Sequence, residues 1–128
     1  MFNGYKRDHA HAEAAAEHRK REDDAPRLRS AAPDLKTLRL TFDEVRPNGA
    51  STATAYARPI VVASAPAHFE VRCMEPRCDG RHDLTAPILR ALSDRLKTYR
   101  GQSVCNGVIN NTMCDRTLTY SYEATYSS

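Results

Sequence analysis

The chain has 128 residues with 19 basic and 16 acidic side chains, and it contains no tryptophan. Its surplus of three positive charges is spread along the whole chain, which argues against a dedicated polyanion-binding protein with one strongly basic face. Large apolar residues are concentrated after residue 37, so we expect one core of modest size in that part.

The first residues contain no apolar segment of the kind found in a secretory signal peptide. No stretch approaches the roughly 20 apolar residues that a membrane helix needs. We therefore expect a cytoplasmic protein without membrane contact. In that reducing compartment, cysteines are metal ligands or catalytic groups more often than they are disulfide partners.

Residues 8–24 are rich in helix-forming residues and predict a helix, in which Glu17 and Arg21 form a favourable pair four positions apart. Alanine provides its only apolar stripe, so the isolated helix buries little. It is either a frayed, solvated helix or a helix that binds a partner. Residues 25–33 contain two prolines and predict a linker.

The chain thus divides into a charged, alanine-rich extension with its linker, residues 1–34, and a folded domain, residues 35–128. Alternating apolar and polar residues predict four strands in this domain. The second strand is predicted over residues 54–63. The alternating positions of the other strands are Leu38, Leu40 and Phe42 in the first, Phe69, Val71 and Cys73 in the third, and Leu118, Tyr120, Tyr122 and Ala124 in the fourth. Pro59 confines the second strand to an edge or a bulge, and Pro47-Asn48-Gly49 predicts the preceding turn.

One helix is predicted between the third and fourth strands. Thr85 is a candidate N-cap, Pro87 fits the first turn, and Gly101 is a candidate stop. The apolar residues that recur at helical spacing are Ile88, Leu89, Leu92, Leu96 and Tyr99. The expected fold class is α+β, with a small antiparallel sheet from about residue 36 to 126, one covering helix and a metal site between strand ends.

Two pairs of cysteines carry the clearest chemical signal. Four residues separate Cys73 from Cys78 and eight separate Cys105 from Cys114. Each pair is accompanied by predicted turn residues, which are Pro76, Asp79-Gly80, Asn106-Gly107 and Asn110-Asn111. Thiolates are soft ligands that suit zinc, and four of them fill a tetrahedral shell. We predict one structural zinc ion. Two intrapair disulfides and unliganded thiols remain alternatives.

His82 is close enough in the sequence to replace one cysteine as a ligand, or to form a hydrogen bond with a ligand without touching the metal. Because four cysteines already suffice, a surface or capping histidine is the preferred interpretation. Asp83 is a candidate partner for the helix N-terminus. The histidines of the extension, His9, His11 and His18, are expected to be solvated.

The order of strand, cysteine knuckle, helix, second knuckle and strand resembles zinc-ribbon modules. More narrowly, the run APAHFEVRCMEPRCDGRHDLTAPILRAL, with the later CNG, the last cysteine and the final aromatic strand, resembles small uncharacterised bacterial proteins that share this pattern. The resemblance covers roughly residues 58–126 and implies a zinc-ribbon-like fold without implying a function. Ribbon modules usually keep two residues between the cysteines of each pair, unlike this chain.

Catalytic motifs are missing from the sequence: it has no glycine-rich phosphate loop, no HExxH and no serine-nucleophile elbow. The leading hypothesis is therefore a non-enzymatic, zinc-stabilised binding or adaptor module. A small enzyme with an exposed thiol or an open zinc site, assembled with His82 and Glu75 or Asp79, is the first alternative.

Residues 1–34 are the expected contact with a larger protein or ribonucleoprotein assembly. The candidate contact residues are the basic side chains Arg19, Lys20, Arg21, Arg27 and Arg29. Acidic residues 22–24 interrupt this series, so binding to nucleic acid is expected to be weak. The second alternative function is a weak nucleic-acid-binding protein. Tyr120, Tyr122 and Tyr126 fall on one face of the last strand; core packing is their default role, and a platform that stacks on unpaired bases is the alternative.

Overall fold

The computed structural model describes residues 2–45, 56–73, 77–78, 80–114 and 116–127. The helices are α1 (Phe2–Asp24), α2 (Leu28–Ala31) and α3 (Thr85–Ser93), and the strands are β1 (Leu35–Val45), β2 (Tyr56–Ile60), β3 (Glu70–Arg72), β4 (Arg81–Asp83), β5 (Thr98–Val104), β6 (Val108–Ile109), β7 (Thr112–Met113) and β8 (Thr117–Tyr126). The α+β class with a small antiparallel sheet is confirmed. Within the described ranges, none of the helices combines the length and apolar character that a membrane crossing requires.

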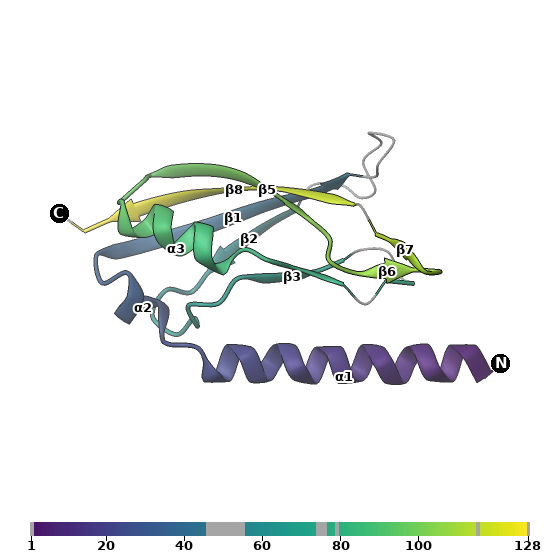
Figure 1. Cartoon of the computed structure of the whole chain (residues 1–128). Coiled ribbons are helices and arrows are strands. Elements are labelled where there is room, and N and C mark those ends of the chain that lie inside the picture. Colours follow the sequence, from purple (N-terminus) through teal and green to yellow (C-terminus); the bar gives the residue numbers. More distant parts are fainter. Residues whose placement is uncertain (1, 46–55, 74–76, 79, 115, 128) are drawn as a thin grey trace.

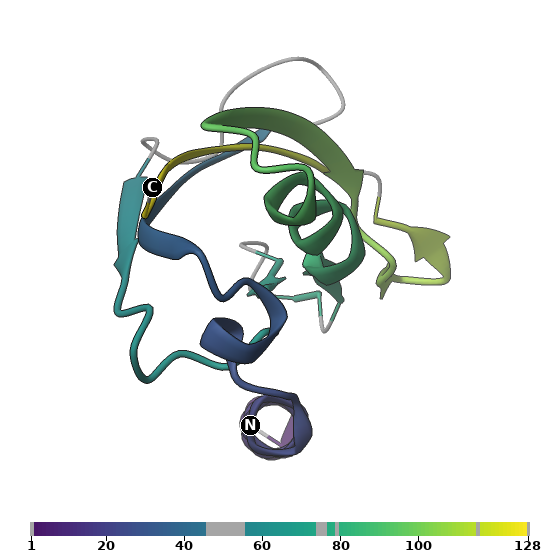
Figure 2. The same ribbon diagram turned by 90° about the vertical axis from the view of Figure 1, so that its left-hand side faces the viewer.

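Four strands form one antiparallel sheet in the order β2-β1-β8-β5, whereas β3–β4 and β6–β7 form separate two-stranded ribbons. The sheet is curved, and its concave side faces α3, α2 and the β3–β4 ribbon (Figures 1 and 2). The long helix α1 lies outside this layer, beyond β3 as seen from the sheet. The single sheet expected from the sequence is thus one sheet with two small ribbons.

The centre of the sheet is the pairing of β1 with β8, in which Leu38 lies opposite Ala124, Leu40 opposite Tyr122 and Phe42 opposite Tyr120. All six side chains are buried in one apolar cluster, as the period-two alternation predicts. Burial of Tyr120 and Tyr122 shows that these rings pack in the core, and the alternative of an exposed base-stacking platform is wrong.

The edge position predicted for Pro59 is confirmed, because β2 is an outer strand and Pro59 lies opposite Arg39 of β1. Its C-terminal end, at Ile60, comes before the predicted end at residue 63. The predicted turn at residues 47–49 lies outside the described residues.

The helix prediction is correct at its start and wrong at its end. α3 stops at Ser93, where Arg95 adopts a left-handed φ of 56° and the amide of Leu96 donates to the carbonyl of Ala91. This is a Schellman stop with arginine at the position that glycine usually occupies. Gly101, the predicted stop, lies instead in β5, where the ring of Tyr120 crosses its Cα and leaves no room for a side chain.

Capping of α3 also differs from the prediction. Thr85 is the first helical residue rather than the N-cap, and its hydroxyl accepts a hydrogen bond from the amide of Phe69. The predicted role of Asp83 is confirmed, since its carboxylate accepts a hydrogen bond of 3.1 Å from the amide of Thr85.

The segment predicted as a linker contains α2, and Leu28 within it is completely buried in the main core. The Leu28 amide donates to the carbonyl of Ala65, and the Ala67 amide donates to that of Pro26. The core therefore begins before residue 35, and the C-terminal end of α1 is tied to the domain by only a few intervening residues.

Candidate metal centre

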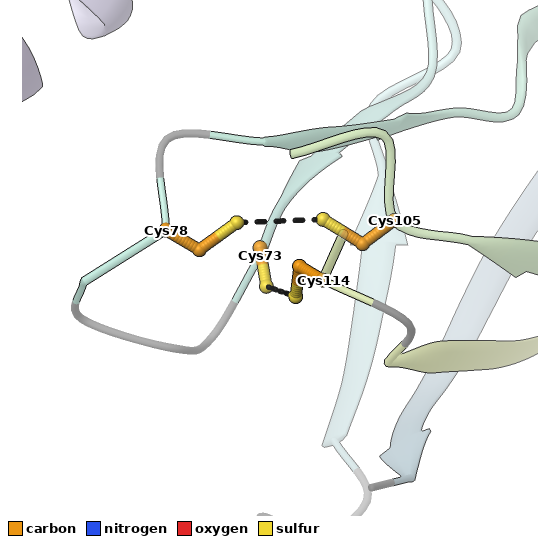
Figure 3. Close-up of side chains that lie close together, drawn as sticks. All are labelled: Cys73, Cys78, Cys105 and Cys114. Carbon is orange, nitrogen blue, oxygen red and sulfur yellow. Dashed lines mark hydrogen bonds between the residues drawn. The ribbon is translucent and has the colours of Figure 1, made fainter. Parts of the chain in front are cut away.

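The four cysteines come from the ends of four strands. Cys73 follows β3, Cys78 precedes β4, Cys105 follows β5, and Cys114 lies between β7 and β8. Their side chains point toward one another (Figure 3). The centre therefore connects both ribbons with two strands of the main sheet.

The spacing of the sulfurs fits a tetrahedral thiolate site. All four Sγ atoms lie within 4.8 Å of one another, with 3.6 Å between Cys78 and Cys105 and 3.7 Å between Cys73 and Cys114. Four ligands at a zinc–sulfur distance of about 2.3 Å are separated from each other by about 3.8 Å. Disulfide sulfurs are about 2.05 Å apart, so the structure holds thiols and not the intrapair disulfides.

The same local motif, cysteine followed two positions later by glycine, occurs on both sides of the centre. The amide of Gly80 donates to Cys78 Sγ at 3.3 Å, and the amide of Gly107 donates to Cys105 Sγ at 3.4 Å. Hydrogen bonds of this kind stabilise the charged form of a sulfur ligand. The two loops thus present their sulfurs in matching ways.

Each glycine also packs against the sulfur of the other loop. A Cβ atom added to Gly80 would lie 2.5 Å from Cys105 Sγ, and one added to Gly107 would overlap Cys78 Sγ. The close approach of the two loops therefore requires glycine at both positions. The repeated Cys-x-Gly motif was the available signal for this contact, although its spacing alone does not reveal the crossed packing.

Burial decides the electrostatics of the centre. Cys78, Cys105 and Cys114 are buried, Cys73 is partly exposed, and burial raises the pKa of the Cys105 thiol to about 12. A thiolate at this place consequently needs a nearby cation. Among the residues that the structure describes, the group able to hold a metal ion consists of these four cysteines.

His82 lies outside this group, and the predicted surface position is wrong. It occupies β4 opposite Val71, on the face that points into the core, and is completely buried. Its Nδ1 lies 3.1 Å from the hydroxyl oxygen of Ser103 on β5. His82 therefore links the β3–β4 ribbon to the main sheet.

Asn110 and Asn111, predicted as turn residues, connect β6 to β7. Both have left-handed φ angles, 50° and 64°, as a two-residue type I′ hairpin requires. The hairpin delivers the chain from Gly107 back to Cys114, whose amide donates to the Gly107 carbonyl at 2.9 Å.

The helical part of the predicted extension, α1, contacts a buried carboxylate of the domain, Glu70 on β3. Arg21 of α1 donates to both of its oxygens, at 2.7 and 2.8 Å, and His18 Nδ1 lies 3.2 Å from Oε2. From the domain, Arg81 donates at 2.9 Å and His68 Nε2 lies 3.0 Å away. We call Glu70 and these four side chains the Glu70 cluster.

Burial alone would raise the pKa of Glu70, but its hydrogen bonds with Arg21 and His68 outweigh that effect and lower the pKa to about 2. The carboxylate is therefore charged at all physiological pH values. A buried charge of this kind is costly unless its partners remain in place, so the cluster holds α1 against the ribbon.

The predicted contact residues are consequently divided between two roles. Arg21 points inward to Glu70, whereas Arg19, Lys20 and Arg29 are exposed. Arg27 is also exposed and donates to the carbonyl of Ser64. His18, predicted to be solvated, belongs to the Glu70 cluster, while the side chains of His9 and His11 lie outside what the structure describes.

Comparison of this chain with protein-family models, with curated proteins and with solved structures finds no match.

Replacing Gly107 by alanine should weaken metal binding, because the new methyl group overlaps Cys78 Sγ and separates the two loops. We expect at least a tenfold loss of zinc affinity, about 1.4 kcal/mol or more, measured by competition with a chromophoric chelator. Gly101→Ala is the matched control, since its methyl group meets Tyr120 and should lower stability without changing zinc affinity. Equal zinc affinities for Gly107→Ala and the wild type would contradict the crossed packing.

Replacing Glu70 by glutamine should release α1, because Arg21 and His18 lose their charged partner. Amide hydrogen exchange in residues 12–24 should accelerate while β1 and β8 stay protected. In the wild type, the contribution of Glu70 is complete above pH 4.5 and is lost as the pH falls toward 2, since its pKa is lowered on folding. Asp34→Asn, which removes an exposed ion pair with Arg95, is the control. Unchanged exchange of α1 in Glu70→Gln would show that other contacts hold the helix.

Proposed function

We propose that this protein is a non-enzymatic binding module, stabilised by one zinc ion on Cys73, Cys78, Cys105 and Cys114, that engages a protein or ribonucleoprotein assembly through α1. The observation that carries the proposal is the close approach of four sulfurs from four strand ends, all within 4.8 Å of one another. A zinc-ribbon-like role of the two Cys-x-Gly loops, each presenting sulfur to a common ion, is part of it.

The closed donor set favours a structural role over catalysis. Four thiolates fill the usual coordination shell of zinc, and no position is left for water or substrate. Catalytic zinc sites keep one such position open. The same chemistry favours a reducing compartment such as the cytoplasm, where thiols persist.

Zinc binding also supplies stability that the two short ribbons lack. The strands β6 and β7 have two residues each, and β3 and β4 have three each, so neither ribbon is stable by itself. A metal bound to their ends contributes its binding free energy directly to folding.

The partner is assigned to α1 because the helix presents a long charged face to solvent. Its exposed side chains in the described part include Glu13, Glu17, Arg19, Lys20 and Asp23. Mixed charge suits a protein surface of mixed charge better than a phosphate backbone. The face turned to the domain is already occupied by Arg21 and His18.

Removal of zinc by a strong chelator should unfold the two ribbons, and each Cys→Ser variant should lose the metal. Since structural zinc sites bind with about 10–16 kcal/mol, the loss of stability should reach several kcal/mol. His82→Ala should also lower stability, by about 1–3 kcal/mol, because a buried group is removed, yet it should retain one zinc per chain. Zinc content measured on each purified variant separates the two classes. Metal loss in His82→Ala equal to that in Cys105→Ser would make His82 a ligand.

The partner surface is tested by reversing charge on the outward face of α1. The double variant Arg19→Glu/Lys20→Glu should abolish co-purification of the partner, while Arg100→Glu on the exposed side of β5 should retain it. Tagged proteins purified side by side from their source cells and compared by quantitative mass spectrometry provide the measurement. Equal recovery of every associated protein with the double variant and the control would remove α1 from the interface.

A further inference from the structure

A cleft of about 260 Å³ lies between α1 and the loops of the metal centre. The side chains that matter for its chemistry are Glu17 and Arg21 from α1, Glu70 and Arg72 from β3, Arg81 from β4, and Asn106 from the second cysteine loop. Three arginines from three different elements thus meet around one cavity. Neither the zinc centre nor the proposed partner face makes use of this arrangement.

Arg72 and Arg81 lie directly opposite each other in the antiparallel β3–β4 ribbon. Opposite residues of such a pair project from the same face, so both guanidinium groups belong to the side that lines the cleft. Like charges in this position destabilise a two-stranded pair. Arg81 is paired with Glu70 at 2.9 Å and lies 3.9 Å from Asp83, so this repulsion is only partly offset.

Glu70 is the nearest buried negative charge, but its oxygens are already occupied. Oε1 accepts from Arg21 and Arg81 and lies 3.0 Å from His68, while Oε2 accepts from Arg21 and lies 3.2 Å from His18. Among the described residues, no ion pair or hydrogen bond to the guanidinium of Arg72 is observed. Its positive charge is therefore uncompensated within this part of the chain.

Other groups at the cleft are suited to an anion. The side-chain carbonyl of Asn106 accepts from the amide of Arg81 at 2.9 Å, which leaves its NH₂ group as a donor. Glu17 is 72% exposed, so water screens its charge. The guanidinium forks of Arg72 and Arg81 match the oxygens of a tetrahedral oxyanion.

We propose that this cleft binds a phosphate group, either free or carried by a small organic molecule, with Arg72 as its principal ligand and Arg81 and Asn106 as supporting donors. A phosphate with two negative charges relieves the repulsion between the opposed arginines. Because the cleft is bordered by α1 and by both cysteine loops, a bound phosphate connects the extension with the metal centre. The inference goes beyond the proposed function and does not depend on the partner.

Thermal unfolding of the full-length, zinc-loaded protein tests the site, with inorganic phosphate exchanged for chloride at constant ionic strength. Wild-type protein should melt several degrees higher in about 10 mM phosphate, because a ligand that binds only the folded state stabilises it. Arg72→Gln should lose this shift. Without phosphate the same variant should melt about 1–4 °C above the wild type, because the like-charge pair is gone.

Arg100→Gln is the matched control, since Arg100 is exposed on β5 away from the cleft. It should keep the wild-type response to phosphate. A nucleoside 5′-monophosphate forms the second arm: a shift at lower concentration than inorganic phosphate identifies a phosphate on an organic molecule, and equal shifts identify the free anion. The proposal is overturned if the wild type shows no shift, or if Arg72→Gln responds to phosphate as the wild type does.

Discussion

The meeting of four sulfurs within 4.8 Å is the constraint on which the rest of this structure depends. The main sheet does not depend on a metal ion for its stability, because β1 and β8 pair over their whole length and bury a continuous row of apolar side chains. The two ribbons are different: within the part of the chain that the structure describes, neither pairs with the main sheet as a further strand. In the function we propose, a cation shared by Cys73, Cys78, Cys105 and Cys114 joins the ends of these short ribbons to β5 and β8. Its binding free energy then stabilises segments too small to fold independently.

The parts of the fold that the sequence predicts correctly are those in which local periodicity and burial agree. Leu38, Leu40 and Phe42 alternate with polar residues and form the centre of the sheet, as does the last strand. The prediction fails where spacing is ambiguous: Leu92, Leu96 and Tyr99 continue a helical pattern past the true end of α3. Tertiary contacts end the helix, because the hydroxyls of Tyr122 and Tyr126 both donate to the Leu96 carbonyl. No local signal in residues 85–101 reveals partners that lie more than 25 positions away.

The candidate site shows the same division. Cysteine is a recognisable metal ligand by residue type alone. The four candidate ligands are therefore predictable, although their spacing departs from that of ribbon modules. The attachment of α1 is not predictable, because Arg21 binds Glu70, which lies 49 positions later in the chain. In the local sequence Glu70 looks like an ordinary polar residue of an alternating strand. The predicted surface position of His82 is wrong because local sequence hides its register. A polar residue beside turn-forming neighbours suggests exposure, whereas the pairing of His82 opposite Val71 places its side chain in the core. Pairing register, which sequence alone leaves open, decides the position of His82.

Helix α1 is therefore an attached part of the molecule with one face turned to Glu70 and the other to solvent, and the cleft beside it borders the metal centre. The proposed function requires that a metal ion holds the cysteine loops together. Native mass spectrometry of the freshly isolated full-length protein tests that requirement most directly. The account predicts a single species that carries one zinc ion per chain and becomes lighter by that mass after denaturation in acid. A metal-free chain that is lighter than the fully reduced sequence by the hydrogens lost in two disulfides would contradict it.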